Sequence, residues 1–380
     1  MQVISEEIGK CIQSASWIRR MFEAGIELKQ KFGADEVCDF TLGNPDLPPV
    51  PQVAFALRSL ADTVGQPLSL GYMPNAGLSS TRQRLAEHLA REQKVLLTPS
   101  HVIVTCGAAG GLNVVFRAVL EQDDEVICPS PYFVEYGFYA ANYRGKLVPV
   151  PSKLPGFSLD VDALEAAITP KTRVVLIDSP NNPTGVVYSQ DELKELAAVL
   201  VRASQEFGRP IYLVSDEPYR FLTYDAVEVP PVLPLYPFAV AVGSFSKSLS
   251  LAGERIGYIA VNPAMPQGDE LIAGLILCNR ILGYVNAPVI GQRVVDLGAA
   301  PGGWSQIAAA KVKSLEGQGQ VVAIDYLAVD PIPGVEFVQL DFTAPEAKDK
   351  LKAMLKKGGA DVVLSDMAAP TVGHTKTDHL

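Results

Sequence analysis

Short apolar segments alternate with helical segments along most of this chain, and this alternation constrains the fold more than any other feature of the sequence. The apolar segments between residues 101 and 242 are four or five residues long, which is typical of strands buried on both faces. Strands that alternate with helices form a mostly parallel sheet covered by helices, so we predict an α/β fold. The predicted strands are 101–105, 125–128, 146–150, 174–177, 211–214 and 238–242. The predicted helices are 79–93, 110–120, 160–168 and 190–206.

The alternation stops and starts again near residue 293. Every arginine lies at or before Arg293, and a new apolar segment at 294–297 leads into a glycine-rich turn. We therefore expect two α/β units joined at this point. The predicted regions are an N-terminal arm with part of a small domain (1–45), a large domain (46–270), a connecting helix (271–293) and a second unit (294–380) with strands at 294–297, 321–324, 335–340 and 362–364.

Composition excludes several classes of protein. The chain has 380 residues, of which 48% are hydrophobic and 19% charged, as in globular proteins. The net charge of −10 disfavours a nucleic-acid or anionic-membrane binder, because both partners require a basic face. The five cysteines are scattered without a C-x-x-C pair, which indicates free thiols and no metal site. With no apolar core of a signal peptide in residues 1–20, and no apolar run long enough to span a bilayer, we expect a cytoplasmic protein.

An ordered set of polar residues predicts a cofactor site. The amine of Lys247 can bind an aldehyde covalently and then act as a general base. Asp216, just after the predicted strand 211–214, can hold the proton of a pyridine nitrogen, since an adjacent carboxylate favours the protonated ring. Tyr219 and Asn182 can hydrogen-bond a phenolate oxygen. Pyridoxal phosphate (PLP) makes these demands, so we predict it as the cofactor, with Lys247, Asp216 and Tyr219 as catalytic residues.

A second group of residues can hold the phosphate and the ring of this cofactor. The turn that begins with Gly107 and Ala108 follows a strand and opens a helix, so its N–H groups can cradle an anion. Ser244 and Arg255 flank the lysine and supply a hydroxyl and a guanidinium. Phe133 is the candidate face for stacking on the ring.

Taken in order, these motifs resemble those of the class I/II aminotransferases of PLP fold type I, over residues 1–293. The matching motifs are Gly43-Asn44-Pro45-Asp46, Tyr72 before Pro74 and Gly77, Asn182-Pro183-Thr184-Gly185, Asp216-Glu217-Pro218-Tyr219, and Ser244-x-x-Lys247 with Arg255. The resemblance implies a fold type I large domain with a partial small domain. It also implies transfer of an amino group from an amino acid to a 2-oxo acid. Finally, it implies a homodimer in which Tyr72 reaches the partner's cofactor phosphate, with the backbone of Gly43 lining the substrate side.

The resemblance also implies a defect. Members of this family carry, in a C-terminal segment, an arginine that clamps the substrate α-carboxylate, whereas this chain has no arginine after Arg293. A bidentate guanidinium–carboxylate contact is strong and fixes orientation, so its loss predicts impaired transamination. The amino-acid specificity stays open, because part of the side-chain pocket belongs to the same segment.

The last region carries a different signature. The run Asp296-Leu297-Gly298-Ala299-Ala300-Pro301-Gly302-Gly303-Trp304 follows a predicted strand, and its glycines let the backbone approach a ligand closely. Together with Ser365-Asp366-Met367-Ala368-Ala369-Pro370, it resembles the FtsJ-like ribosomal RNA ribose 2′-O-methyltransferases, which use S-adenosylmethionine (SAM), over residues 291–380. The resemblance implies a Rossmann-like unit, truncated because later strands of the family have no counterpart before Leu380. It further implies a SAM site in which Gly302, Trp304, Asp325 and Asp341 contact SAM and Asp366 lies at the position of methyl transfer.

Two alternatives therefore stand beside the aminotransferase, namely an rRNA methyltransferase fragment and a catalytically inactive chimera. The methyltransferase family has a lysine before its first strand, and it has a lysine and a glutamate after the Asp366 motif. This chain lacks all three of these residues. Residues 294–380 hold 8 lysines against 11 acidic residues, so we expect no RNA partner and no methyl transfer. The stretch 291–295 fits either family, and such a join is what recombination, engineered fusion or a sequence-assembly error leaves.

Overall fold

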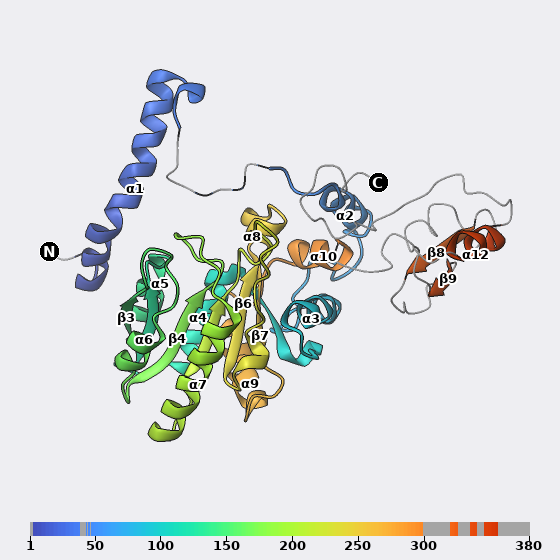
Figure 1. The fold of residues 1–380 in the computed structure, drawn as a ribbon. Coiled ribbons are helices and arrows are strands. Elements are labelled where there is room, and N and C mark those ends of the chain that lie inside the picture. Colours follow the sequence, from blue (N-terminus) through green and yellow to red (C-terminus); the bar gives the residue numbers. More distant parts are fainter. Residues whose placement is uncertain are drawn as a thin grey trace. The chain divides into compact units, whose positions relative to one another are not determined.

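The computed structural model describes residues 3–38, 43, 45, 47–298, 320–325, 335–339 and 346–355 (Figure 1). The chain divides into two compact units, Met1–Pro48 and Pro49–Leu380, each considered separately below. Within the described ranges, no helix has both the length and the apolar character that crossing a membrane requires.

The first unit consists mainly of helix α1 (Glu6–Phe32), followed by the short 3-10 helix η1 (Ala34–Glu36). Ser5 caps the start of α1, where its side-chain oxygen accepts a hydrogen bond from the backbone N–H of Ile8 at 3.2 Å. Gly33 ends the helix with φ at 98°, a conformation that glycine adopts without a steric cost. Most of the predicted arm is therefore one long helix.

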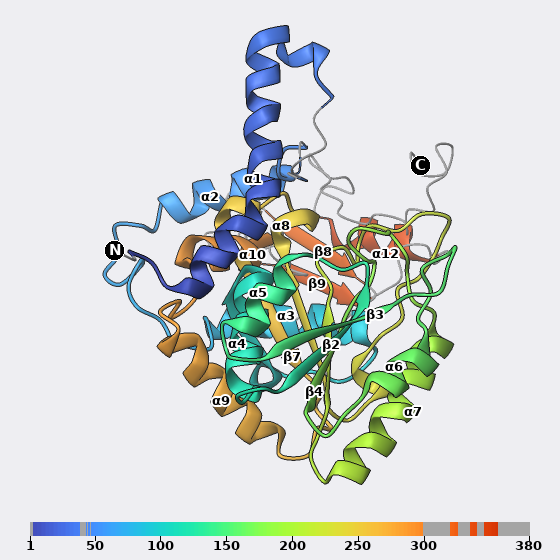
Figure 2. The ribbon, with the colours of Figure 1, turned by 90° about the vertical axis from the view of Figure 1, so that its left-hand side faces the viewer.

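A seven-stranded sheet forms the centre of the second unit (Figures 1 and 2). Its strands are β1 (Val102–Cys106), β2 (Glu125–Ser130), β3 (Lys146–Pro151), β4 (Thr172–Asp178), β5 (Tyr212–Asp216), β6 (Ala239–Ser244) and β7 (Ile256–Val261). The strand order is β1-β7-β6-β5-β4-β2-β3. Five strands from β3 to β6 run parallel, whereas β7 lies antiparallel between β6 and β1. The predicted mostly parallel sheet is confirmed, but β7 was not among the predicted strands.

Helices cover both faces of this sheet (Figure 2). On one face lie α4 (Gly107–Val119), α5 (Glu135–Ala141) and α9 (Gly268–Ile281). On the other lie α3 (Ser79–Gln93), α6 (Val161–Ala167) and α7 (Gln190–Phe207). The shorter elements of this unit are η2 (Pro99–His101), η3 (Leu233–Leu235), α8 (Phe245–Ser248) and η4 (Ala252–Glu254).

Strand β4 shows why short apolar segments suit this architecture. Val174 and Leu176 pack in the core beneath α4 and α9, while Val175 and Ile177 pack in the core beneath α3 and α7. All four side chains are fully buried. Because successive residues of a strand point to opposite faces, four consecutive apolar residues supply both cores at once.

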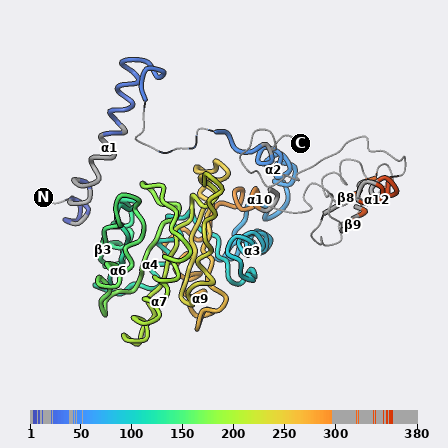
Figure 3. The backbone as a smooth tube through the Cα atoms, viewed as in Figure 1, coloured from blue at the N-terminus to red at the C-terminus, as the bar shows by residue number. Residues whose placement is uncertain are grey.

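Helix α10 (Val289–Gly298) contradicts the strand predicted at 294–297. It packs against α2 (Pro51–Ala61) and α3 (Figure 3). Val294 joins a small apolar cluster with residues of α2, and the adjacent Val295 lies in the main core, with 3% and 1% of their surfaces exposed. Both valines are therefore buried against α2 and the core of the large sheet.

The neighbours of α10 explain why the strand prediction was wrong. A Cβ atom on Gly291 would lie 2.5 Å from Cγ1 of Ile256, so the helix approaches β7 at van der Waals contact. The side chain of Gln292 is fully buried and accepts a hydrogen bond from the backbone N–H of Leu78 at 2.9 Å. Its backbone oxygen accepts another from the Thr81 hydroxyl at 3.2 Å. The valines favour strands only weakly, and these long-range contacts outweigh that preference.

The described part of the last region contains two paired strands and a helix. Strands β8 (Val321–Asp325) and β9 (Val335–Gln339) run parallel, and α12 (Ala347–Met354) follows them. Gln320 donates hydrogen bonds to Glu336 and to the backbone oxygen of Met354, each at 2.7 Å. The strands predicted at 321–324 and 335–340 are confirmed over their described residues, and the one predicted at 362–364 lies outside them.

Candidate active site

Four predicted residues gather at one edge of the sheet, where the parallel strands end. Asp216 is the last residue of β5 and Ser244 the last of β6. Asn182 lies in the loop after β4, and Lys247 lies in α8, which begins directly after β6. In open α/β sheets, ligands bind outside the carboxyl ends of the strands, so these side chains lie at the expected position.

Asp216 is buried, and among the described residues only one of its two carboxyl oxygens accepts a hydrogen bond. The hydroxyl of Tyr136, from α5, donates a hydrogen bond to Oδ2 at 2.8 Å. The other oxygen, Oδ1, is buried and accepts no hydrogen bond from the described residues. Burial raises the pKa of Asp216 to about 7, although the hydrogen bond from Tyr136 opposes that change. A buried acceptor of this kind suits an N–H donor from a ligand.

Asn182 and Tyr219 lie together beside this carboxyl group. The amide Nδ2 of Asn182 is 3.4 Å from the Tyr219 hydroxyl, to which it donates a long hydrogen bond. Burial raises the pKa of Tyr219, as do the nearby acidic groups of Asp178 and Asp216. The phenol therefore keeps its proton at neutral pH and can donate it in a hydrogen bond.

Lys247 is partly buried in the short helix α8. Removal from water lowers the pKa of its ammonium group, because burial penalises the charged form. A larger fraction of the neutral amine is then present at neutral pH than in an exposed lysine. The neutral amine is the form that attacks a carbonyl carbon.

The residues predicted to hold a phosphate also come together. Ser244 pairs with Gly257 of β7, and a Cβ atom on Gly257 would lie 2.4 Å from the carbonyl carbon of Gly107. Gly107 has φ at 69°, and a Cβ atom there would lie 2.7 Å from Nη2 of Arg255. Ala108 follows in the first turn of α4. This arrangement places a guanidinium and a hydroxyl beside the N-terminus of a 13-residue helix, a favourable setting for an anion.

Phe133 packs beside the residue that holds Asp216. Its ring makes an edge contact with the ring of Tyr136, with centroids 5.5 Å apart and planes at 78°. It is partly buried against the core under α4 and α5. Its predicted stacking on a cofactor ring stays a prediction.

The remaining predicted residues lie elsewhere or outside the described residues. Tyr72 lies between α2 and α3 with its whole surface exposed in this single chain. Gly43 belongs to the first unit, and its backbone has open space at the Cβ position. Asp325 ends β8. The other predicted SAM residues lie outside the described residues, namely Gly302, Trp304, Asp341 and Asp366.

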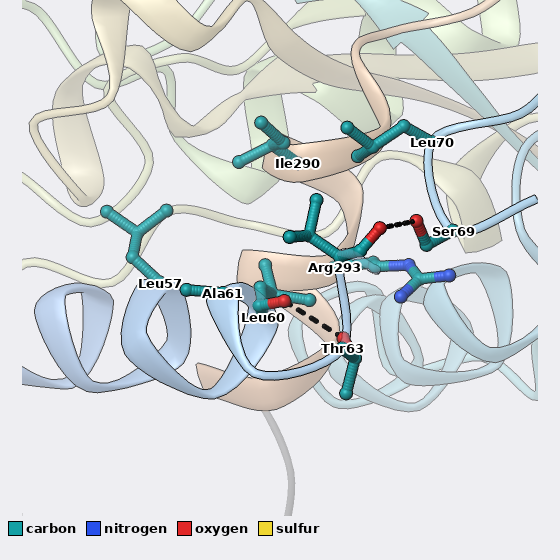
Figure 4. Close-up of a pocket in the computed structure, with 9 residues that line it drawn as sticks. Leu57, Leu60, Ala61, Thr63, Ser69, Leu70, Ile290 and Arg293 are labelled. Carbon is teal, nitrogen blue, oxygen red and sulfur yellow. Dashed lines mark hydrogen bonds between the residues drawn. The ribbon is translucent and has the colours of Figure 1, made fainter. Parts of the chain in front are cut away.

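An apolar pocket of about 240 Å³ is separate from these groups (Figure 4). It is lined by α2, α10 and the segment between α2 and α3, and none of the predicted site residues line it. Arg293 of α10 is among its lining residues, together with Leu70 and Ile290. The last arginine of the chain therefore lies beside an apolar pocket.

The sequence analysis missed two neighbours of Asp216, namely Asp178 and Tyr136. Asp178 is the last residue of β4 and pairs in register with Asp216 on β5. The signal for Asp178 was present, because two neighbouring predicted strands both run into an aspartate. Tyr136 carried no comparable signal, since only the packing of α5 brings its hydroxyl to Asp216.

Comparisons with known proteins match the two parts of the chain to different families. Residues 35–295 match the family Aminotransferase class I and II, and residues 281–380 match the family FtsJ-like methyltransferase. Both predicted resemblances are confirmed, and the two matches overlap around the predicted join.

Individual relatives follow the same division. A probable aspartate/prephenate aminotransferase of Aquifex aeolicus is 40% identical over 194 residues, which cover 50% of this chain and 48% of that protein. A ribosomal RNA large subunit methyltransferase E of Xanthobacter autotrophicus is 63% identical over 90 residues, covering 24% and 35%. A crystal structure of an aminotransferase from Eubacterium rectale has 36% identity and a TM-score of 0.74, covering 83% of this chain and 81% of that one. The chain thus spans about half the length of the Aquifex relative and about a third of the Xanthobacter relative.

Proposed function

Because this chain belongs to the aminotransferase class I and II family, we propose that it binds PLP between Asp216 and Lys247 and transfers an amino group from an amino acid to a 2-oxo acid. We further propose that this activity is impaired. The buried, unpartnered Oδ1 of Asp216 is the observation that carries the proposal, since a buried acceptor without a donor is rare in folded proteins.

The residues at the strand ends fit the cofactor at both of its charged ends. The protonated pyridine nitrogen would donate to Asp216 Oδ1. The turn at Gly107 has room for a phosphate oxygen near the backbone because it lacks a Cβ, which would lie 2.7 Å from the Arg255 guanidinium. Ser244 would add a hydroxyl donor. When bound, PLP supplies an electron-withdrawing ring that stabilises negative charge at the α-carbon of the amino acid.

The side chains of the chain itself then divide the remaining work. Lys247 would hold the cofactor's aldehyde and later move the α-proton, and its lowered pKa suits it to both roles at neutral pH. Tyr219 and Asn182 would donate hydrogen bonds to the phenolate oxygen. Asp216 would keep the ring nitrogen protonated, because an adjacent negative charge stabilises the protonated ring.

The proposed impairment rests on the sequence that follows the aminotransferase match. Residues 294–380 contain no arginine, and Arg293 lines the apolar pocket instead. Without a guanidinium to clamp the α-carboxylate, an amino acid would bind more weakly and in less uniform orientations. We expect the turnover to fall more than the affinity for the cofactor, because the proposed phosphate and ring contacts come from residues 107–255, which precede the region without arginine.

Further aspects of the function are proposals as well. We propose a homodimer through the aminotransferase part, in which the exposed Tyr72 reaches the partner's phosphate site and Gly43 lines the substrate side. We also propose that the protein works in the cytoplasm. The division into regions 1–45, 46–270, 271–293 and 294–380 remains a proposal. Helix α10 spans the boundary between its last two regions.

Visible absorption of the purified protein tests the main proposal. After incubation with PLP, we expect an absorption band from lysine-bound cofactor that disappears in Lys247→Ala and persists in the control Lys194→Ala, whose side chain is 55% exposed on α7. Adding amino donors one at a time should bleach the band slowly. A band that ignores every donor would leave cofactor binding without transamination, and no band in the unmodified protein would refute the proposal.

A second candidate function is SAM-dependent methyl transfer, favoured by the 63% identity of residues in the last region to a ribosomal RNA methyltransferase. The helical state of 294–297 argues against it, because that segment is the first strand expected for the SAM-binding sheet. The excess of acidic residues in 294–380 also disfavours RNA as a partner. We therefore propose that this part of the chain does not act as a methyltransferase while α10 is formed.

A further inference from the structure

Two aspartates lie side by side at the carboxyl ends of neighbouring parallel strands. Asp178 of β4 and Asp216 of β5 are partners in the register of the sheet. Their side chains point to the same face, because Leu176 and Val214, two residues earlier in each strand, belong to the same core. Only 3% and 5% of these aspartates is exposed, so water screens neither of them.

The hydrogen bonds of this pair leave one oxygen of each carboxyl group without a donor. Asp178 Oδ2 accepts a hydrogen bond from the backbone N–H of Asn182 at 2.8 Å, and Asp216 Oδ2 accepts one from Tyr136. Oδ1 of both residues is buried without a hydrogen-bond partner among the described residues. In the same part of the chain, neither carboxyl group forms an ion pair with a lysine, arginine or histidine.

Burial is the largest effect on the pKa of both carboxyl groups and raises each of them, whereas the hydrogen bond of Tyr136 lowers them. Cys128 of β2 and Tyr136 of α5 are buried, and their pKa values are raised by burial and by the negative charge of the neighbouring aspartate pair. Tyr188 and Tyr219 likewise have raised pKa values. Burial and the charge of Asp216 raise the pKa of Asp178 well above its ordinary value. Two carboxyl groups in such a site share a single negative charge, as like charges at short range cannot both be accommodated.

We propose that Asp178 is a positioning residue for the proposed PLP site, and that it remains a neutral carboxylic acid so that Asp216 alone carries the negative charge. This inference rests on the proposed function. The neutral Asp178 still accepts the hydrogen bond from the Asn182 backbone. It therefore links the residue that would meet the ring nitrogen to the one that would meet the phenolate oxygen.

Infrared difference spectroscopy tests the protonation of Asp178 directly. Spectra of the unmodified protein would be compared with those of Asp178→Asn, at neutral pH, without cofactor and with pyridoxamine phosphate. We expect a C=O band of a protonated carboxylic acid that is lost in Asp178→Asn. Glu217→Gln is the matched control, because Glu217 is buried too and burial raises its pKa, and that variant should keep the band. A band that survives in Asp178→Asn, or none in the unmodified protein, would overturn the inference.

Binding of pyridoxamine phosphate, which needs no bond to Lys247, separates the charge of Asp178 from its hydrogen bond. Asp178→Asn should bind within about threefold of the unmodified protein, because a neutral amide replaces a neutral acid that accepts the same hydrogen bond. Asp178→Ala should bind about tenfold more weakly, because the N–H of Asn182 loses its acceptor. An affinity change of tenfold or more in Asp178→Asn would mean that a charge was removed and would contradict the inference. Failure of the unmodified protein to bind any cofactor would instead refute the proposed function, while the infrared comparison without cofactor still decides the state of Asp178.

Discussion

Residues 294–297 and 321–325 belong to the same methyltransferase-like match and both have the apolar pattern of a strand, yet they adopt different structures. The first lies in helix α10, packed on α2 and α3, while the second is strand β8, paired with β9. The difference lies in the partners available to each segment. Val294 and Val295 pack against apolar residues of the aminotransferase-like part. Residues 321–325 instead pair with β9, which belongs to the same methyltransferase-like match. Local pattern sets what a segment can become, and its neighbours decide between the options.

The largest expected effect comes from placing a charge in the helical segment. Val295→Asp should lower the free energy of unfolding of the second unit by about 4 kcal/mol or more, because an unpaired carboxylate would be buried in the main core. Chemical denaturation monitored by far-ultraviolet circular dichroism measures this change. In the same helix, Ile290 is 42% exposed, and Ile290→Asp should cost less than about 1 kcal/mol. Equal effects of the two variants would show that α10 does not pack as described.

A smaller substitution distinguishes a packed helix from an unpacked one by its sign. Gly291→Ala should destabilise the protein by about 1–3 kcal/mol, since the new Cβ would lie 2.5 Å from Ile256. An unpacked helix would instead gain up to about 1 kcal/mol from alanine. Gly274 in α9 has open space at its Cβ position, so Gly274→Ala is the control and should be stabilising. The measurement is the urea midpoint of all three proteins at equal slope.

The pair at the strand ends should make the stability of the cofactor-free protein depend on pH. Burial raises the pKa of both Asp178 and Asp216, the latter to about 7, whereas an unfolded aspartate titrates near 4. The folded state therefore binds more protons than the unfolded state in this window, and stability should fall as the pH rises from about 4 through about 7. In Asp178→Asn that fall should be smaller, because one of the two groups that hold a proton in the folded state is gone. Thermal unfolding at several pH values tests this, with Asp191→Asn as the control, because Asp191 is 95% exposed.

The smallest expected effect is the response to SAM. With 294–297 held in α10, titration calorimetry of the full chain with SAM should give no saturable heat. Saturable binding at micromolar concentration would contradict this expectation. It would imply that the segment leaves the helix to form a strand, and the Gly291→Ala variant, which weakens the packing of the helix from outside 294–297, should then bind SAM more tightly.

The residues at the strand ends were predictable because their chemistry is local. Lys247, Asp216, Asn182 and Tyr219 occur in short motifs, and the structure places them at one sheet edge, as the alternation of strands and helices requires. The six predicted strands of the large sheet were also accessible, because a run of apolar residues buried on both faces differs from any exposed segment.

Other features depend on contacts between distant residues and could not be predicted locally. Strand β7 lies antiparallel between β1 and β6, and its residues carry no pattern that specifies this place. Tyr136 reaches Asp216 across 80 positions of sequence. Helix α10 required knowledge that α2, α3 and Ile256 present an apolar surface of the right shape. In each case the missing information was tertiary packing.

The place of β7 also has a consequence for synthesis of the chain on the ribosome. Strand β1 hydrogen-bonds only to β7 within the sheet, and β7 is translated roughly 150 residues later. While the intervening strands assemble, β1 and the turn at Gly107 emerge without their neighbour, with an open edge exposed to other nascent chains. The turn at Gly107, which we propose holds a phosphate, is therefore among the last parts of this sheet to be completed, and a chaperone would act most usefully in that interval.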